Sequence, residues 1–122
     1  MGMDVFGTSG NYFRASIWSW RAILLALFLS GFTAPDSWAC NDGDGLESAG
    51  DCLMLADQLE DFLHQWDGDT LVYESDAPLR VDQKGRFVDR STPGSKSPYS
   101  VERDHLTEFV SFLRTCDGFE IR

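Results

Sequence analysis

The side chains of this sequence that could do chemistry are two histidines, three cysteines and twenty carboxylates. His64 and His105 could bind zinc together with neighbouring carboxylates, because zinc accepts imidazole and carboxylate ligands. Both lie on or beside the polar faces of predicted helices, which favours two surface histidines. The loop 40–51 has the spacing of a calcium loop but begins with a cysteine, so a solvated turn is favoured. No zinc-protease, Walker, Gly-x-Ser-x-Gly or Cys-x-x-Cys motif is present, so we expect no enzyme, metal or cofactor.

Carboxylates dominate the charge of the sequence. There are 20 Asp and Glu against 10 Lys and Arg, which gives a formal charge of -10 and a pI near 4.4. A strongly acidic surface repels phosphate backbones and disfavours docking on anionic lipid, so nucleic acid is excluded as a partner. Five of the cations fall within residues 80–96, whereas the acids are dense between residues 42 and 69.

An acidic helix face favours fast, salt-sensitive association with a basic protein partner. Charged contacts from one helix and its end, and two aromatic anchors beside them, make up the predicted binding site. These residues are Asp57, Glu60, Asp61, Asp67, Trp66 and Tyr73. The alternative is a solvated acidic surface that binds no partner.

Two of the three cysteines are predicted to form a disulfide. Cys52 and Cys116 each fall on the apolar face of a predicted helix, and antiparallel packing would bring the start of one helix to the end of the other. Closing a loop of about 64 residues contributes on the order of 4 kcal/mol in the chain-entropy model. Two free buried thiols, or a bond between Cys40 and Cys52, are the alternatives.

Two amphipathic helices are expected to position these residues. Apolar side chains recur at helical spacing over 52–66, after Ser48, which with an acid three residues later resembles a capping box. A second apolar stripe lies within 100–116, where Ser100 is a natural N-cap and Gly118 a typical residue after a helix end.

Short strands are expected between and after the helices. The β-branched and aromatic residues at 70–74 predict one strand, and the segments 79–82 and 86–89 flank a turn that contains Gly85. Residues 119–122 alternate and could add a last strand. The order α-β-β-β-α-β predicts a small single α+β domain, with two antiparallel helices packed on a short antiparallel sheet.

The first 39 residues have the pattern of a secretory signal peptide. An unbroken apolar run of eleven residues at 22–32 follows Arg14 and Arg21. This run is about half of the roughly 20 residues that a membrane span needs. We therefore predict a signal peptide over 1–39 with cleavage after Ala39, an acidic domain over 40–122, and no membrane span in the mature chain. An uncleaved anchor and an ordinary buried helix are the alternatives.

These patterns together predict an exported protein, periplasmic or secreted, that binds or inhibits another protein. By analogy, an immunity or inhibitor protein that neutralises a basic envelope-targeting hydrolase or toxin would have this size, charge and disulfide. The alternative is an accessory or structural subunit of a cell-envelope assembly. Such a subunit would be tethered by an uncleaved N-terminus or by a lipid on Cys40.

Overall fold

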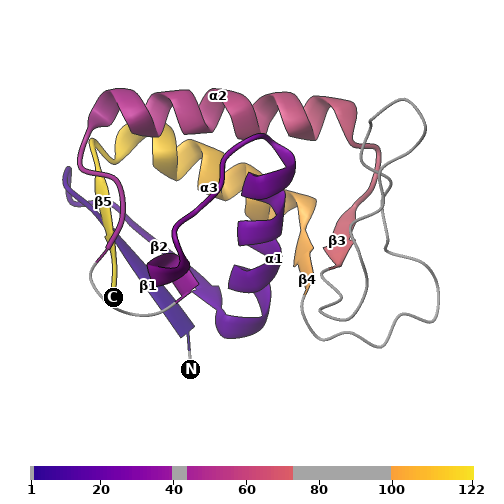
Figure 1. Ribbon diagram of the computed structural model, residues 1–122, viewed down its shortest axis with the longest axis horizontal. Coiled ribbons are helices and arrows are strands. Elements are labelled where there is room, and N and C mark those ends of the chain that lie inside the picture. The colour runs from indigo at the N-terminus through magenta and orange to yellow at the C-terminus, as the bar shows by residue number, and fades with distance from the viewer. Residues whose placement is uncertain (1, 40–43, 73–99) are drawn as a thin grey trace.

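The computed structural model of the chain describes residues 2–39, 44–72 and 100–122. The helices and strands that it contains are β1 (Gly2–Gly7), β2 (Tyr12–Ser16), α1 (Ile17–Leu29), the 3-10 helix η1 (Asp36–Ala39), α2 (Ala49–Gln65), β3 (Thr70–Val72), β4 (Ser100–Glu102), α3 (Arg103–Thr115) and β5 (Phe119–Ile121). Figure 1 shows α2 along one long side of the molecule and α1 crosswise to it. The molecule is a small α+β domain, which confirms the predicted fold class.

The main sheet is antiparallel and has the strand order β2-β1-β5. The middle strand aligns Val5 with Phe13 on one side and with Ile121 on the other. Side chains alternate across the pleat, so Val5, Phe13 and Ile121 are buried while Tyr12 and Glu120 face outward. A second antiparallel sheet of two strands joins β3 to β4.

Helix α2 confirms the helix that the apolar spacing predicts. The Ser48 side chain accepts a hydrogen bond from the Asp51 backbone N–H, as a helix cap does. The predicted strand at 70–74 is present as β3 over Thr70–Val72. The sequence prediction was wrong about Ser100, which begins strand β4 rather than capping a helix. Because residues 100–102 pair with β3, helix α3 begins only at Arg103.

Helices α2 and α3 pack antiparallel, as the sequence predicts. Arg114, in the last turn of α3, contacts Asp57 and Glu60 of α2, and Arg103 at the start of α3 contacts the Leu63 carbonyl near the end of α2. Gly118 adopts a φ of 114° just beyond α3, a conformation that glycine tolerates best, and β5 follows at once.

Residues 2–39 form part of the core. They supply 11 of the 28 buried hydrophobic residues in the described ranges. Helix α1 is apolar almost all around, as expected for a helix with neighbours on several sides. Its Trp20 indole N–H donates to the Trp38 carbonyl oxygen over 2.7 Å. Within the described residues, no helix combines the length and apolar character that a bilayer crossing requires.

The signal peptide predicted over residues 1–39 stays a prediction, although residues 2–39 pack in the core. Several other predictions concern residues outside the described ranges. They are the strands at 79–82 and 86–89, the aromatic anchor Tyr73, and the lipid on Cys40.

The segment 44–46 lies against the edge of β5 and needs a glycine at its centre. The Phe119 N–H donates to the Leu46 carbonyl, and a Cβ atom at Gly45 would overlap the Phe119 carbonyl oxygen. We expect Gly45→Ala to lower the free energy of unfolding by about 1–3 kcal/mol, because backbone atoms must move apart. Urea denaturation monitored by circular dichroism measures this change.

Gly50 provides the matched control for that substitution. It lies in the first turn of α2, where the nearest atom to an added Cβ is the Ser48 Oγ at 3.5 Å. Gly50→Ala is expected to leave stability unchanged or to raise it by up to about 1 kcal/mol, through helix propensity. Equal losses in the two variants would contradict the close approach at Gly45.

Candidate functional site

The candidate site is the acidic face of α2 and its ends, here called the α2 acidic face. Residues 47–69 contain no Lys or Arg. Their carboxylates are those of Glu47, Asp51, Asp57, Glu60, Asp61, Asp67 and Asp69. The described residues hold 15 of the 20 acids and 5 of the 10 cations, so the whole formal charge of -10 resides in them.

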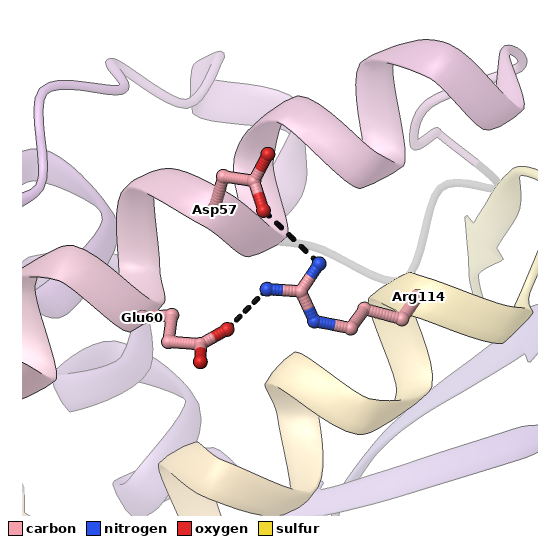
Figure 2. Close-up of polar contacts among 3 residues, drawn as sticks. All are labelled: Asp57, Glu60 and Arg114. Atoms are coloured by element: carbon pink, nitrogen blue, oxygen red, sulfur yellow. Dashed lines mark hydrogen bonds and ion pairs between the residues drawn. The ribbon is translucent and has the colours of Figure 1, made fainter.

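Two carboxylates of this face are already paired within the molecule. Figure 2 shows the Arg114 guanidinium reaching from α3 to α2, between Asp57 and Glu60. One nitrogen donates to the Asp57 carboxylate over 3.0 Å, and another donates to Glu60. The hydrogen bond to Glu60, followed in size by the hydrogen bond to Asp57, raises the pKa of Arg114. Two of the predicted partner contacts therefore help to dock α2 on α3, and their charge is partly neutralised.

Two other predicted contacts remain available on the surface. Asp61 and Asp67 are exposed, and neither forms a hydrogen bond or ion pair with another residue of the described ranges. Beside the carboxylates, Leu53 is 44% exposed and Met54 is 61% exposed. These two apolar side chains were not among the predicted contacts, although their positions off the buried stripe of α2 can be recognised from the helical spacing.

Trp66 lies in the interior and not on this face. Only 5% of its surface is exposed, and its ring stacks against Phe62 while the Arg103 guanidinium lies 4.7 Å from the ring centroid. A side chain enclosed in this way cannot insert into a partner without local unfolding. We therefore correct its predicted role from an aromatic anchor to a packing residue at the end of α2.

Arg103 fastens the end of α2 to the start of α3. Its guanidinium donates to the carbonyl oxygens of Leu63, Gly68 and Trp66, at 2.9 Å for Gly68 and 2.8 Å for Leu63. The last carbonyl groups of a helix have no backbone N–H partner within that helix, and these carbonyls lie at or just beyond that end of α2. We expect Arg103→Lys to lower the free energy of unfolding by about 1–3 kcal/mol, because an ammonium group cannot reproduce the planar fork of donors.

Arg122→Lys is the control for this prediction, measured by the same denaturant titration. Arg122 is 64% exposed and pairs with Glu120 on the outer face of the sheet. Its replacement is expected to change stability by less than about 1 kcal/mol, as is usual for an exposed pair. An Arg103→Lys variant as stable as Arg122→Lys would refute the fastening role.

The two cysteines predicted to pair are neighbours in the fold. Cys52 lies in the first turn of α2, Cys116 follows α3, and each is fully buried. The structure holds them as free thiols, and the Cys116 Sγ donates to the Leu113 carbonyl oxygen over 3.6 Å. Burial and the contact with Cys116 raise the pKa of Cys52 to about 12. The packing therefore brings together the two sulfurs of the predicted disulfide.

A shallow groove lies between the end of β1, the segment 44–47 and β5. It measures about 450 Å³, and its lining includes Phe6, Glu47, Glu120 and Arg122. The Arg122 guanidinium pairs with Glu120 and lies 5.7 Å from the centroid of Phe6. Sequence reasoning missed this groove because it depends on the pairing of β1 with β5.

The two histidines do not form a metal centre with other ligands of the described ranges. Across residues 2–39, 44–72 and 100–122, no group of three or more His, Cys, Asp or Glu side chains is placed to hold a metal ion. The His105 Nε2 lies 3.0 Å from the Arg14 carbonyl oxygen, and the His105 ring packs on Phe13. His64 is exposed on α2.

Comparison of the chain with protein-family models, with curated proteins and with solved structures finds no match in any of the three.

Proposed function

We propose that this protein binds a basic protein partner through the α2 acidic face and thereby inhibits it. The observation that carries the proposal is the concentration of carboxylates over residues 47–69, with no Lys or Arg among them. Partner recognition falls to exposed side chains that pair with no other described residue, above all Asp61 and Asp67. A basic hydrolase or toxin that acts on the cell envelope is the partner class we propose.

Exposed apolar side chains support a protein partner over a small cation. Leu53 and Met54 lie on the same helix as the carboxylates, and protein interfaces combine an apolar centre with a charged rim. Methionine adapts its shape to the surface that it meets. The rim charges are expected to accelerate association, and the apolar centre to lower the dissociation rate.

Affinity capture with two single-charge reversals tests this proposal. The immobilised full chain is expected to retain a basic protein from an envelope extract at low salt and to release it at high salt. Asp61→Lys is expected to slow association with the captured protein at least tenfold, because charge reversal opposes electrostatic steering. Surface plasmon resonance at several ionic strengths measures the association rate.

Glu108→Lys is the matched control, because it changes the net charge equally. Glu108 is exposed on α3 and forms no ion pair with a described residue. If the partner contacts the α2 acidic face, Glu108→Lys is expected to slow association much less than Asp61→Lys does. Equal slowing in both variants would attribute the effect to net charge alone, and capture of an acidic partner would refute the proposal.

Export is a separate part of this proposal and rests on the pattern of residues 1–39. Intact-mass analysis of protein made with its own N-terminus, after cell fractionation, tests it. An exported chain that begins at Cys40 would support export and cleavage, and it would contradict the packing of residues 2–39 in the core. A full-length chain recovered from the cytosol would refute export, and a full-length or acylated chain in the envelope would favour a tethered subunit.

A further inference from the structure

We propose that Cys52 and Cys116 exchange with external thiols and disulfides only while the chain is unfolded, so the folded protein preserves the redox state in which it folded. The proposal rests on how the fold encloses the pair and is independent of any partner. Both side chains have 0% exposure, and the Cys52 thiol lies near enough to Cys116 for each to affect the protonation of the pair. An external disulfide therefore has no path to either sulfur in the folded molecule.

The β1–β2 hairpin covers the end of α3 that carries Cys116. The Ser9 backbone N–H donates to the Cys116 carbonyl over 3.0 Å, and the Ser9 hydroxyl donates to the Thr115 carbonyl. The Asn11 side-chain amide donates to the Thr115 hydroxyl over 2.8 Å. Reaching Cys116 would require this turn to leave the helix end.

Protonation adds a second barrier to exchange. Thiol–disulfide exchange needs a thiolate, and burial together with the neighbouring thiol raises the pKa of Cys52 to about 12. An exposed cysteine in an unfolded chain has a pKa of about 8.5, so a much larger fraction of it is thiolate near neutral pH. The greater nucleophilicity of a more basic thiolate offsets only part of that difference.

In the unfolded chain both sulfurs are accessible and the reaction balances with a low-molecular-weight disulfide as oxidant. One cysteine thiolate attacks glutathione disulfide, forms a mixed disulfide and releases one glutathione thiolate. The second cysteine thiolate then displaces the other glutathione and closes the Cys52–Cys116 bond. The cysteines lose two electrons and two protons, and glutathione disulfide is reduced to two molecules of glutathione.

The experiment uses the full chain with Cys40→Ser, so that the third cysteine cannot exchange. The reduced folded protein and the same protein in denaturant are each exposed to glutathione disulfide at equal pH. Samples are quenched with acid, labelled with a maleimide and weighed by mass spectrometry. We expect the folded protein to be oxidised at least a hundredfold more slowly than the unfolded protein. Refolding in the presence of glutathione disulfide should close the bond between the two cysteines.

The reverse reaction and a hairpin variant complete the test. The refolded disulfide form is expected to resist dithiothreitol at least a hundredfold longer than the denatured form. Asn11→Ala, which loosens the turn over α3, is expected to speed oxidation of the folded protein without changing the unfolded rate. Folded and unfolded rates within tenfold of each other, in either direction, would overturn the proposal. Refolding that leaves both thiols free would overturn it too.

Discussion

A chain that starts at Cys40 is expected to lose cooperative folding, although every residue of the predicted acidic domain remains. The deletion removes β1, which is the middle strand of its sheet, and leaves β5 without its strand partner. It also removes 11 of the 28 buried hydrophobic residues in the described ranges, among them Val5, Trp20 and Ile23. Burial of each large apolar side chain contributes about 1.5–3 kcal/mol, whereas the net stability of a typical domain is only about 5–15 kcal/mol, so exposing the core surface that packed on this segment is expected to unfold the remainder.

Urea titrations of the full chain and of residues 40–122, followed by near-ultraviolet circular dichroism, measure this effect. A peptide of residues 1–39 added to the shorter chain serves as the control, because noncovalent complementation should restore the native spectrum. A cooperative transition of residues 40–122 with the full chain's midpoint would contradict the structural role of the N-terminal segment. That result would instead support the predicted cleavage after Ala39.

The second large effect is expected at Trp20, and it tests the same packing with one side chain. Trp20 is 1% exposed, donates to the Trp38 carbonyl and meets the ring of Phe109 edge-on at 5.9 Å between centroids. Trp20→Ala is expected to lower the free energy of unfolding by about 3–5 kcal/mol, because it leaves a cavity and an unpaired carbonyl. Denaturant titration of the full chain measures the loss.

Trp18→Ala makes the same chemical change two residues away on α1. Trp18 is 48% exposed, so its removal is expected to lower stability by less than about 1 kcal/mol. Trp20→Phe should fall between the two variants, because it keeps an aromatic ring but not the donor to Trp38. Equal stabilities of the Trp18 and Trp20 variants would show that α1 does not pack in the core.

Helices α2 and α3 could be predicted from the sequence because their signals are local. The apolar spacing of α2, its Ser48 cap and the glycine after α3 all lie within a few residues of the elements that they define. Strand β4 could not be found in this way. Ser100 also suits a helix start, and only the distant pairing with β3 makes Ser100–Glu102 a strand.

The N-terminal segment shows a different limit of sequence reasoning. A short apolar run after an arginine fits the pattern of a signal peptide. It fits equally well the pattern of a helix that is buried in its own domain. The alternation of buried Met3 and Val5 with outward Asp4 and Phe6 was a strand signal that the leader interpretation overrode. A helix of thirteen residues, such as α1, is compatible with both interpretations, so its length alone does not distinguish them.

The charge of the candidate site could be predicted from the sequence, but which of its side chains a partner can reach could not. The carboxylates of Asp57 and Glu60 were recognised, but their shared partner Arg114 lies on another helix, more than 50 residues away. The burial of Trp66 likewise depends on Arg103, which approaches from the start of α3. Sequence spacing places residues on a helix face, whereas packing between helices decides which of them a partner can reach.

The pairing of β1 with β5 has a consequence for synthesis of the chain on the ribosome. Strands β1 and β2 can form their hairpin early, but β1 gains its second neighbour only when Ile121 has been made. At roughly 5–20 residues per second, the intervening stretch of about 100 residues takes on the order of 5–20 s to translate. Throughout that interval the nascent hairpin presents an unpaired strand edge, so a chaperone that shields this edge should increase the yield of native protein.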